Sequence, residues 1–125
     1  MSTFLDNEHK IVQIEAGDTV VLNRRIHHKA IKYASEKNIG FYCGRGTIYG
    51  NKYVMKDESE RDKVVRAYWL DIKHGRTHLK EKDFRVLIGK ALVCWCTPLR
   101  CHCDALKFVA DKLRDGHTFD EIKQM

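Results

Sequence analysis

With 125 residues, the chain has the length of a single domain. Hydrophobic residues make up 43% of it and charged residues 32%, with one proline, which excludes a disordered tail and allows one modest core. No apolar run approaches the roughly 18 residues that a membrane-spanning helix needs. Residues 1–8 lack the basic and apolar stretches of a signal peptide, so the sequence predicts a cytoplasmic protein without a membrane partner.

The chain carries a net positive charge. Lys and Arg number 23 against 17 Asp and Glu, which gives a formal charge of +6 at pH 7. Such a surplus favours anionic partners: a small anion, a nucleotide or a nucleic acid. The densest basic cluster, residues 24–29, holds three positive charges together with His27 and His28. The alternative for this cluster is the solvated start of a helix with both histidines on the surface.

The first half of the chain alternates between strand and helix patterns. Residues 10–15 and 18–23 are short runs with β-branched residues, and we predict a strand for each. Residues 26–37 place apolar side chains at helical spacing and predict a helix that ends at residues 38–40. A short strand over residues 41–43 follows and leads into a glycine-rich stretch.

The second half continues this alternation. A helix is predicted to begin at Ser59, where a capping box is expected, and to reach residue 74. The apolar run at residues 91–96 favours a strand buried on both faces. A helix over residues 102–115 and a last short helix starting at Thr118 complete the prediction. The fold class predicted from this order is α/β, a single small domain over residues 1–125 with a mostly parallel sheet flanked by helices in a Rossmann-like three-layer arrangement.

Two unusual segments start at or near the ends of predicted strands. They are residues 43–51, the glycine loop, and residues 94–104, the cysteine segment. Parallel sheets bind ligands at the carboxyl ends of their strands. We therefore expect the two segments to line one pocket at one edge of the sheet.

The glycine loop has the composition of an anion-binding loop. Glycines let the backbone approach a ligand and expose N–H groups, while an arginine offers a planar fork for phosphate. The alternative is a turn that joins two strands, with the arginine as a surface charge. The candidate ligand-binding residues are Gly44, Arg45, Gly46, Gly50 and Asn51. Arg61 joins them, because a cation in the first turn of a helix opposes the helix dipole and suggests another role.

The cysteine segment holds four of the five cysteines of the chain. An odd number of cysteines without a secretory signal argues against a disulfide framework. We predict Cys96, Cys101 and His102 as ligands of a metal ion, zinc first, with Cys94 or Cys103 as the fourth. The spacing C-x-C-x4-C-H-C differs from paired C-x2-C sites, so a metal-free reactive cysteine and plain structural cysteines stay open as alternatives.

Both segments match a pattern that extends through the residues between them. The matching residues are Gly44, Arg45, Gly50, Asn51, Arg61, Tyr68, Gly89, Lys90, Cys94, Trp95, Cys96, Pro98, Cys101, His102 and Asp104. Over residues 18–114 the chain resembles a small uncharacterised family of phage and bacterial proteins, a domain-of-unknown-function family with the motifs G-R-x(4)-G-N-P and C-W-C-x-P-x-x-C-H-x-D. For a phage-encoded member, the resemblance implies the host cytoplasm.

The chain departs from the family pattern at two positions. Lys52 replaces the proline of the first motif, and Cys103 stands where the family has glycine. The second departure argues against Cys103 as a ligand common to the family. Cys43 occupies an ordinary apolar position, which supports a place in the core.

Two hypotheses of function follow. The first is binding of a nucleotide or nucleobase-like anion, with Arg45 on phosphate and Asn51 on base or sugar. Catalysis of hydrolysis or glycosyl transfer would then use Cys96, Cys101, His102 and Asp104, where Asp104 either orients His102 or caps the helix. The second is a non-enzymatic, metal-stapled module that binds nucleic acid or protein, or that sequesters a nucleotide.

Overall fold

A computed structural model describes residues 3–95 and 99–125. Its elements in chain order are α1 (Thr3–Glu15), β1 (Val20–Asn23), α2 (His28–Glu36), β2 (Gly40–Tyr42), the 3₁₀ helix η1 (Glu58–Glu60), α3 (Arg61–Lys73), α4 (Glu81–Arg85), β3 (Ala91–Cys94), α5 (His102–Arg114) and α6 (Phe119–Lys123). Of the helices within these ranges, none is both long enough and apolar enough to cross a membrane.

The described strands form one parallel sheet. Its order is β1-β3-β2, and Ala91 of the central strand is paired with Val20 on one side and Gly40 on the other. Because the strands are parallel, their last residues Asn23, Tyr42 and Cys94 lie at the same edge. The prediction of a small α/β fold with a parallel sheet is confirmed.

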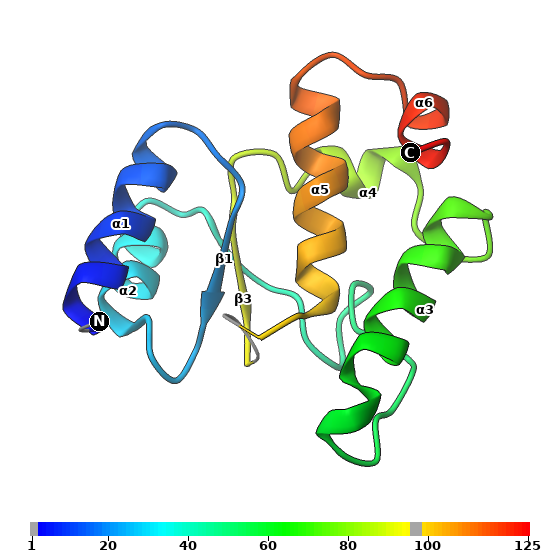
Figure 1. The fold of residues 1–125 in the computed structure, drawn as a ribbon. Helices are drawn as coiled ribbons and strands as arrows, with labels where there is room; N and C mark the ends of the chain where they lie inside the picture. Colours follow the sequence, from blue (N-terminus) through cyan, green and yellow to red (C-terminus); the bar gives the residue numbers. More distant parts are fainter. Residues whose placement is uncertain (1–2, 96–98) are drawn as a thin grey trace.

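Helices cover both faces of the sheet (Figure 1). On one face α1 and α2 pack against Val20 and Leu22, and on the other α3 to α6 enclose Val21 and Leu92. Neighbouring residues of one strand thus enter different cores, which requires apolar residues in succession. This explains why the run of residues 91–94 contains no polar side chain.

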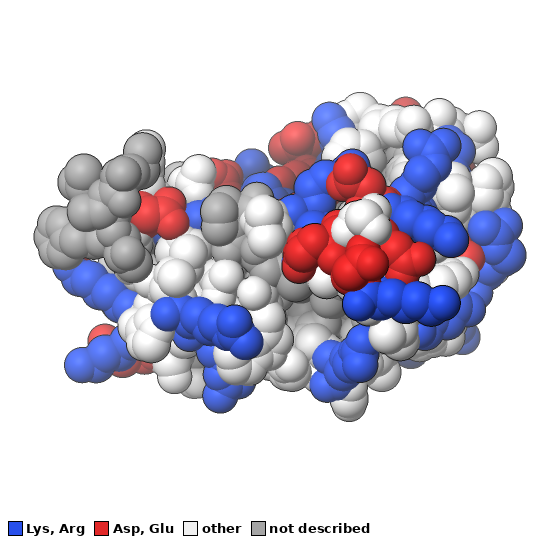
Figure 2. All heavy atoms as spheres, turned by 60° about the horizontal axis from the view of Figure 1, so that its bottom comes forward, with Lys and Arg blue, Asp and Glu red and all other residues white. Residues whose placement is uncertain are grey.

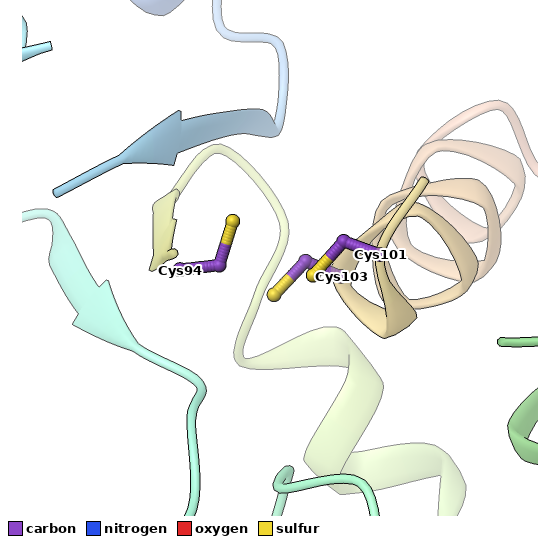
Figure 3. Close-up of side chains that lie close together, drawn as sticks. All are labelled: Cys94, Cys101 and Cys103. Carbon is purple, nitrogen blue, oxygen red and sulfur yellow. The ribbon is translucent and has the colours of Figure 1, made fainter. Parts of the chain in front are cut away.

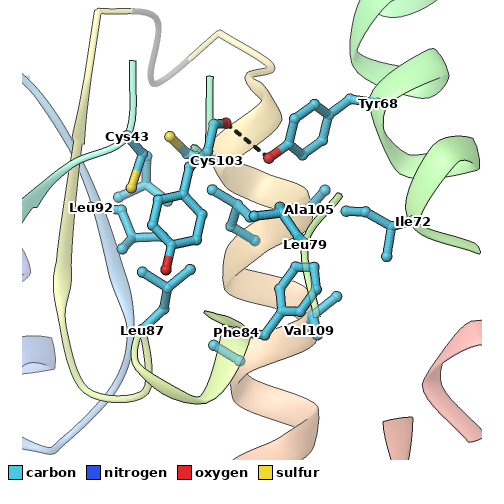
Figure 4. Close-up of a cluster of buried hydrophobic side chains, with 14 of the residues drawn as sticks. Cys43, Tyr68, Ile72, Leu79, Phe84, Leu87, Leu92, Cys103, Ala105 and Val109 are labelled. Atoms are coloured by element: carbon cyan, nitrogen blue, oxygen red, sulfur yellow. Dashed lines mark hydrogen bonds between the residues drawn. The ribbon is translucent and has the colours of Figure 1, made fainter. Parts of the chain in front are cut away.

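The larger core lies between the sheet and α5 (Figure 4). Phe84, Leu87, Leu92 and Leu106 are completely buried in it. Cys43 is also completely buried, which confirms its predicted place in the core. The core therefore holds the end of β2, the middle of β3 and the start of α5 against one another.

The predicted strand at residues 10–15 is wrong, because these residues form the second half of α1. Ile11 and Ile14 are three positions apart and pack on the same core, whereas Val12 is 59% exposed. That spacing belongs to one face of a helix. The Asn7 side chain secures α1, since it donates to the carbonyl of Ile26 and accepts from the N–H group of Ala30.

The observed starts and ends of the helices agree in part with those predicted from the sequence. The predicted helix start at Ser59 is wrong, because α3 begins at Arg61. The cap residue ahead of it is Asp57, whose carboxylate accepts the N–H group of Ser59 at the start of η1. The short α4 was not predicted. The cap of the last helix is confirmed, with the Thr118 hydroxyl accepting the N–H group of Glu121 at 3.1 Å. Asn38 has a φ of 59°, which ends the α2 region as expected.

The basic cluster at residues 24–29 is only partly solvated. His27 is buried, contrary to the surface position expected of it. Its Nδ1 accepts the N–H group of Asn23 at 2.8 Å, and its Nε2 contacts the Asp6 carboxylate. The imidazole thus connects the end of β1 to α1, and His27 itself is the residue that precedes α2.

Candidate functional site

A cavity of about 290 Å³ opens at the carboxyl edge of the sheet. We call it the edge cavity. It is lined from the glycine loop by Gly44, Arg45 and Asn51, and from the cysteine segment by Cys94, Trp95, Arg100, Cys101 and His102. The structure therefore brings together the two segments that the sequence predicted to share a pocket.

The glycine loop is a compact turn. The carbonyl of Gly44 accepts the Thr47 hydroxyl at 2.8 Å, and Gly46 has a φ of 91°, a conformation that favours glycine. A Cβ atom at Gly50 would lie 2.9 Å from the Gly44 carbonyl oxygen. Gly46 and Gly50 thus shape the turn, while Gly44 and Arg45 face the edge cavity.

Arg45 is the cation of this turn that is available to a ligand. Its side chain is exposed, and it makes no hydrogen bond or ion pair with any residue in the described ranges. The lining includes two further arginines, Arg61 and Arg100, and no aspartate or glutamate among the described residues. The edge cavity therefore offers positive charge, and none of the described residues contributes a carboxylate to its wall.

The other two arginines have counterions outside the wall. Arg61 donates from Nε and Nη2 to Glu58, both at 2.7 Å, and from Nη1 to the Arg100 carbonyl at 3.0 Å. Arg100 is paired with Asp62 at 3.3 Å. Acidic side chains gather among basic ones on the face that carries the start of α3 (Figure 2). The Glu58 pair offsets the unfavourable position of Arg61 at the amino end of α3.

Asn51 fastens one wall of the edge cavity to α3. Its amide donates to the Val64 carbonyl at 3.1 Å and accepts the N–H group of Tyr53 at 2.9 Å. Tyr53 in turn donates its hydroxyl to the buried Asp71 at 2.7 Å. Both the NH₂ group and the carbonyl oxygen of the Asn51 amide are thus hydrogen-bonded within the protein. The contact of Asn51 with a base or sugar stays a prediction.

We expect Asp71 to make stability depend on acid pH. The Tyr53 hydroxyl, and then the Arg76 guanidinium, hold the pKa of Asp71 below its ordinary value. A lowered pKa stabilises the fold above the unfolded-state value of about 4, and this contribution is lost as the pH falls through the folded-state value. Asp71→Asn should cost about 1–2 kcal/mol at pH 7 and progressively less as the pH falls below about 4, measured by urea unfolding between pH 7 and pH 3. An equal cost at every pH would contradict this.

Three thiols lie together between the end of β3 and the start of α5 (Figure 3), and two of them, those of Cys94 and Cys101, belong to residues that line the edge cavity. The sulfur atoms of Cys94, Cys101 and Cys103 all lie within 4.8 Å of one another, and all three residues are buried. Cys94 ends β3, while Cys101 and Cys103 come from the start of α5 and point toward it. This group can hold a metal ion. The predicted ligand Cys96 lies outside the described residues. The prediction named Cys94 or Cys103 as the fourth ligand, and both of these residues lie beside Cys101.

The thiol of Cys103 is held in its neutral form in this arrangement. Hydrogen bonds with the thiols of Cys101, Cys43 and Cys94, together with burial, raise its pKa well above the ordinary value. Of these neighbours, Cys43 donates its own thiol to the Phe41 carbonyl at 3.6 Å. Ionisation of Cys103 therefore needs a cation close to the sulfur atom.

His102 stands next to the thiol group. Its Nε2 lies 2.6 Å from the carbonyl oxygen of Cys43, so Nε2 carries the hydrogen and Nδ1 presents its lone pair. Nδ1 is 3.6 Å from the sulfur of Cys101 and can accept its proton. The ring packs against Tyr68, with centroids 5.2 Å apart. Asp104 accepts the N–H group of Cys101 at 3.0 Å, which places it at the cap of α5.

Tyr68 joins this region to the glycine loop. Its buried hydroxyl donates to the Tyr49 carbonyl at 2.8 Å, the contact drawn as a dashed line in Figure 4. Tyr68→Phe should lower the free energy of unfolding by about 1–2 kcal/mol, because a buried carbonyl loses its partner. Urea unfolding measures this, with Tyr33→Phe as the control, since the Tyr33 hydroxyl makes no hydrogen bond within the described ranges. Equal losses in the two variants would refute the assignment.

A larger cavity, of about 560 Å³, lies between α3 and α5. Trp69 and Phe108 line it, and its wall mixes carboxylates such as Asp62 and Asp104 with basic side chains. The described residues that line it include neither a cysteine nor a residue of the glycine loop. The edge cavity is therefore the candidate site, although it is the smaller of the two.

Comparison with known proteins agrees with the resemblance seen in the sequence. A family model described as "Domain of unknown function (DUF4326)" matches residues 26–112. The chain belongs to this family. It is also 31% identical over 86 residues to the "Uncharacterized 12.4 kDa protein in nrdA-td intergenic region" of Enterobacteria phage T4, a match that covers 66% of this chain and 75% of the phage protein. No solved structure matches the chain. All described residues that line the edge cavity fall within the DUF4326 match.

Proposed function

We propose that the edge cavity binds a phosphate-bearing nucleotide or a nucleobase-like anion. The observation that carries this proposal is Arg45, an exposed guanidinium without a counterion within the described ranges, in a wall that holds no described carboxylate. A guanidinium matches phosphate with two parallel hydrogen bonds.

Aromatic side chains favour a nucleotide over a simple anion. Tyr42, Tyr53 and Trp95 line the edge cavity, and Trp95 is 46% exposed. Arg24, which follows β1, lies with its guanidinium 5.6 Å from the Trp95 ring centre. Rings beside arginines provide stacking surfaces for bases and charge for phosphates. A volume of about 290 Å³ is at the lower limit of ligand pockets and suits a mononucleotide.

Cys101 and His102 are the groups that would act on such a ligand. The sulfur of Cys101 is the nucleophile, and Nδ1 of His102, at 3.6 Å, accepts its proton. Asp104 supports the pair by capping the helix that carries both residues. The reaction class is modification of a nucleotide or base, by hydrolysis or glycosyl transfer. Cys96 stays a predicted participant outside the described residues.

The three thiols favour a second candidate, a non-enzymatic binding module. In this case a zinc ion on the thiols would staple the cysteine segment to the end of β3. The edge cavity would then bind a nucleic acid or protein group, or sequester a nucleotide without turnover. The two candidates share the cavity and differ in whether the ligand is changed.

Two measurements test these candidates. Calorimetric titration with nucleoside mono- and diphosphates, with nucleosides as controls, should show binding that requires the phosphate. Mass spectrometry of each bound nucleotide after incubation then detects cleavage or transfer. A product that disappears in Cys101→Ser supports the enzyme, and binding without any product supports the module. Absence of phosphate-dependent binding to the folded protein would disprove the proposal.

A further inference from the structure

We propose that Cys94, Cys101 and Cys103 bind one zinc ion as a three-thiolate centre whose fourth coordination position faces the edge cavity. The metal site rests on the geometry of the three sulfur atoms alone. The assignment of the fourth position to an oxygen atom of the bound anion rests in addition on the anion binding of the proposed function. With Cys101 bound to zinc its sulfur is not a nucleophile, so this centre belongs with the second candidate, the binding module.

The sulfur atoms are close to the positions that zinc requires. Zinc–sulfur bonds of about 2.3 Å in a tetrahedral site place the sulfur atoms about 3.8 Å apart. The three sulfur atoms lie within 4.8 Å of one another, so a contraction of about 1 Å or less completes the site. The end of β3 and the first turn of α5 carry them, and both elements are packed into the larger core.

Charge balance also supports the site. When zinc binds, each thiol loses its proton to water and the electron pair of the S–H bond forms the Zn–S bond, so three protons leave and the centre carries a charge of −1. The amino end of α5, where Cys101 is the N-cap residue, stabilises thiolate charge. Arg45, which has no counterion within the described ranges, adds positive charge on the open side.

Among the described residues three protein ligands meet, and a set of three leaves one coordination position for another molecule, as in catalytic zinc centres. Cys94 and Cys101 line the edge cavity, whereas Cys103 is completely buried behind them. The open side of the centre therefore faces the edge cavity and Arg45. His102 is not one of the three ligands in this arrangement; its Nε2 is held by the Cys43 carbonyl, which fixes the ring beside Cys101.

The first experiment measures zinc in the intact chain. Protein purified with zinc in the medium should contain one zinc per chain by elemental mass spectrometry, and cobalt in its place should show sulfur-to-cobalt charge-transfer bands. Cys103→Ala should weaken zinc binding at least 100-fold in competition with a chelator, whereas Cys43→Ala should retain it. Cys43 is the matched control, because it is equally buried and lies outside the three-thiol group.

A second measurement keeps the test valid if Cys103→Ala does not fold. Alkylation of the native wild-type chain, followed by peptide mass spectrometry, should find Cys94, Cys101 and Cys103 protected until a chelator removes the metal. Stoichiometric zinc that is lost in Cys96→Ala and kept in Cys103→Ala would overturn the ligand set. A folded protein without zinc, in which these thiols react at equal rates with and without chelator, would overturn the site.

The fourth position is tested with inorganic pyrophosphate. Addition of pyrophosphate to the cobalt protein should change the visible bands in the wild type and leave them unchanged in Arg45→Gln, which keeps its metal. Unchanged bands in a wild type that binds pyrophosphate by calorimetry would overturn the open position. Pyrophosphate binding by a chain that holds no metal would overturn only the zinc centre, whereas metal binding without any phosphate binding would remove the proposed function and leave the three-thiolate site.

Discussion

Arg45→Gln should reduce the affinity for pyrophosphate and for nucleoside diphosphates at least tenfold. A hydrogen bond to a charged group contributes about 1.5–3 kcal/mol, and the bidentate contact of a guanidinium with phosphate is lost in the amide. The free energy of unfolding should stay within about 0.5 kcal/mol of the wild type, because Arg45 is exposed and has no partner in the described ranges. Calorimetric titration and urea unfolding measure the two quantities.

Arg85→Gln is the matched control for this substitution. Arg85 is also exposed, but it is paired with Glu81 on α4 and does not line the edge cavity. It removes the same charge from the chain, so a general effect of net charge would appear in both variants. Similar losses of affinity in the two variants would show that the anion does not bind at Arg45.

Phe84→Ala should lower the free energy of unfolding by about 3–5 kcal/mol. Phe84 is completely buried, and its ring packs against Phe119 with centroids 5.4 Å apart. Removal of the ring leaves a cavity between α4, α6 and the larger core. Loss of this size is a large part of the stability of a small domain, so the midpoint of thermal unfolding should also fall by many degrees.

Val86→Ala provides the control two residues away. Val86 is 48% exposed, and its truncation should cost about 1 kcal/mol or less. Urea unfolding of both variants gives the comparison, and pyrophosphate titration below the unfolding range should show wild-type affinity in each. A cost at Phe84 no greater than at Val86 would contradict the packing described for the larger core.

The shared cavity was predictable because two general rules apply to this chain. The runs at residues 91–96 and 41–43 were both predicted as strands, the structure has strands that end at Cys94 and Tyr42, and parallel strands present their carboxyl ends at one edge. The motifs that follow them must then be neighbours. The same rules did not reveal α4, because five residues with a mixed charge pattern carry too little periodicity to predict a helix.

Two errors show where local patterns were ambiguous. The stretch that includes Ile11, Val12 and Ile14 contains β-branched residues that favour a strand, yet Asn7 and the contact with α2 hold it as a helix. His27 belongs to a basic run that is typical of the surface, yet its ring is buried and contacts Asn23 and Asp6 through its two nitrogen atoms. In both cases contacts with residues elsewhere in the chain outweighed local preference.

Features set by neighbouring residues could be predicted from the sequence: a buried apolar strand within residues 91–96 and the cap at Thr118. For the glycine loop, a turn was one of the two alternatives, and the structure has a turn that needs Gly46. Their physical basis is local, since each depends on backbone geometry or on periodic burial within a few positions. The composition of the site depended instead on packing between distant segments. Folding brought Cys94 and Cys103 to Cys101, and it supplied Arg61 and Arg100 with partners while leaving Arg45 open to a ligand, because distances across the sheet edge are set by how the helices pack on it.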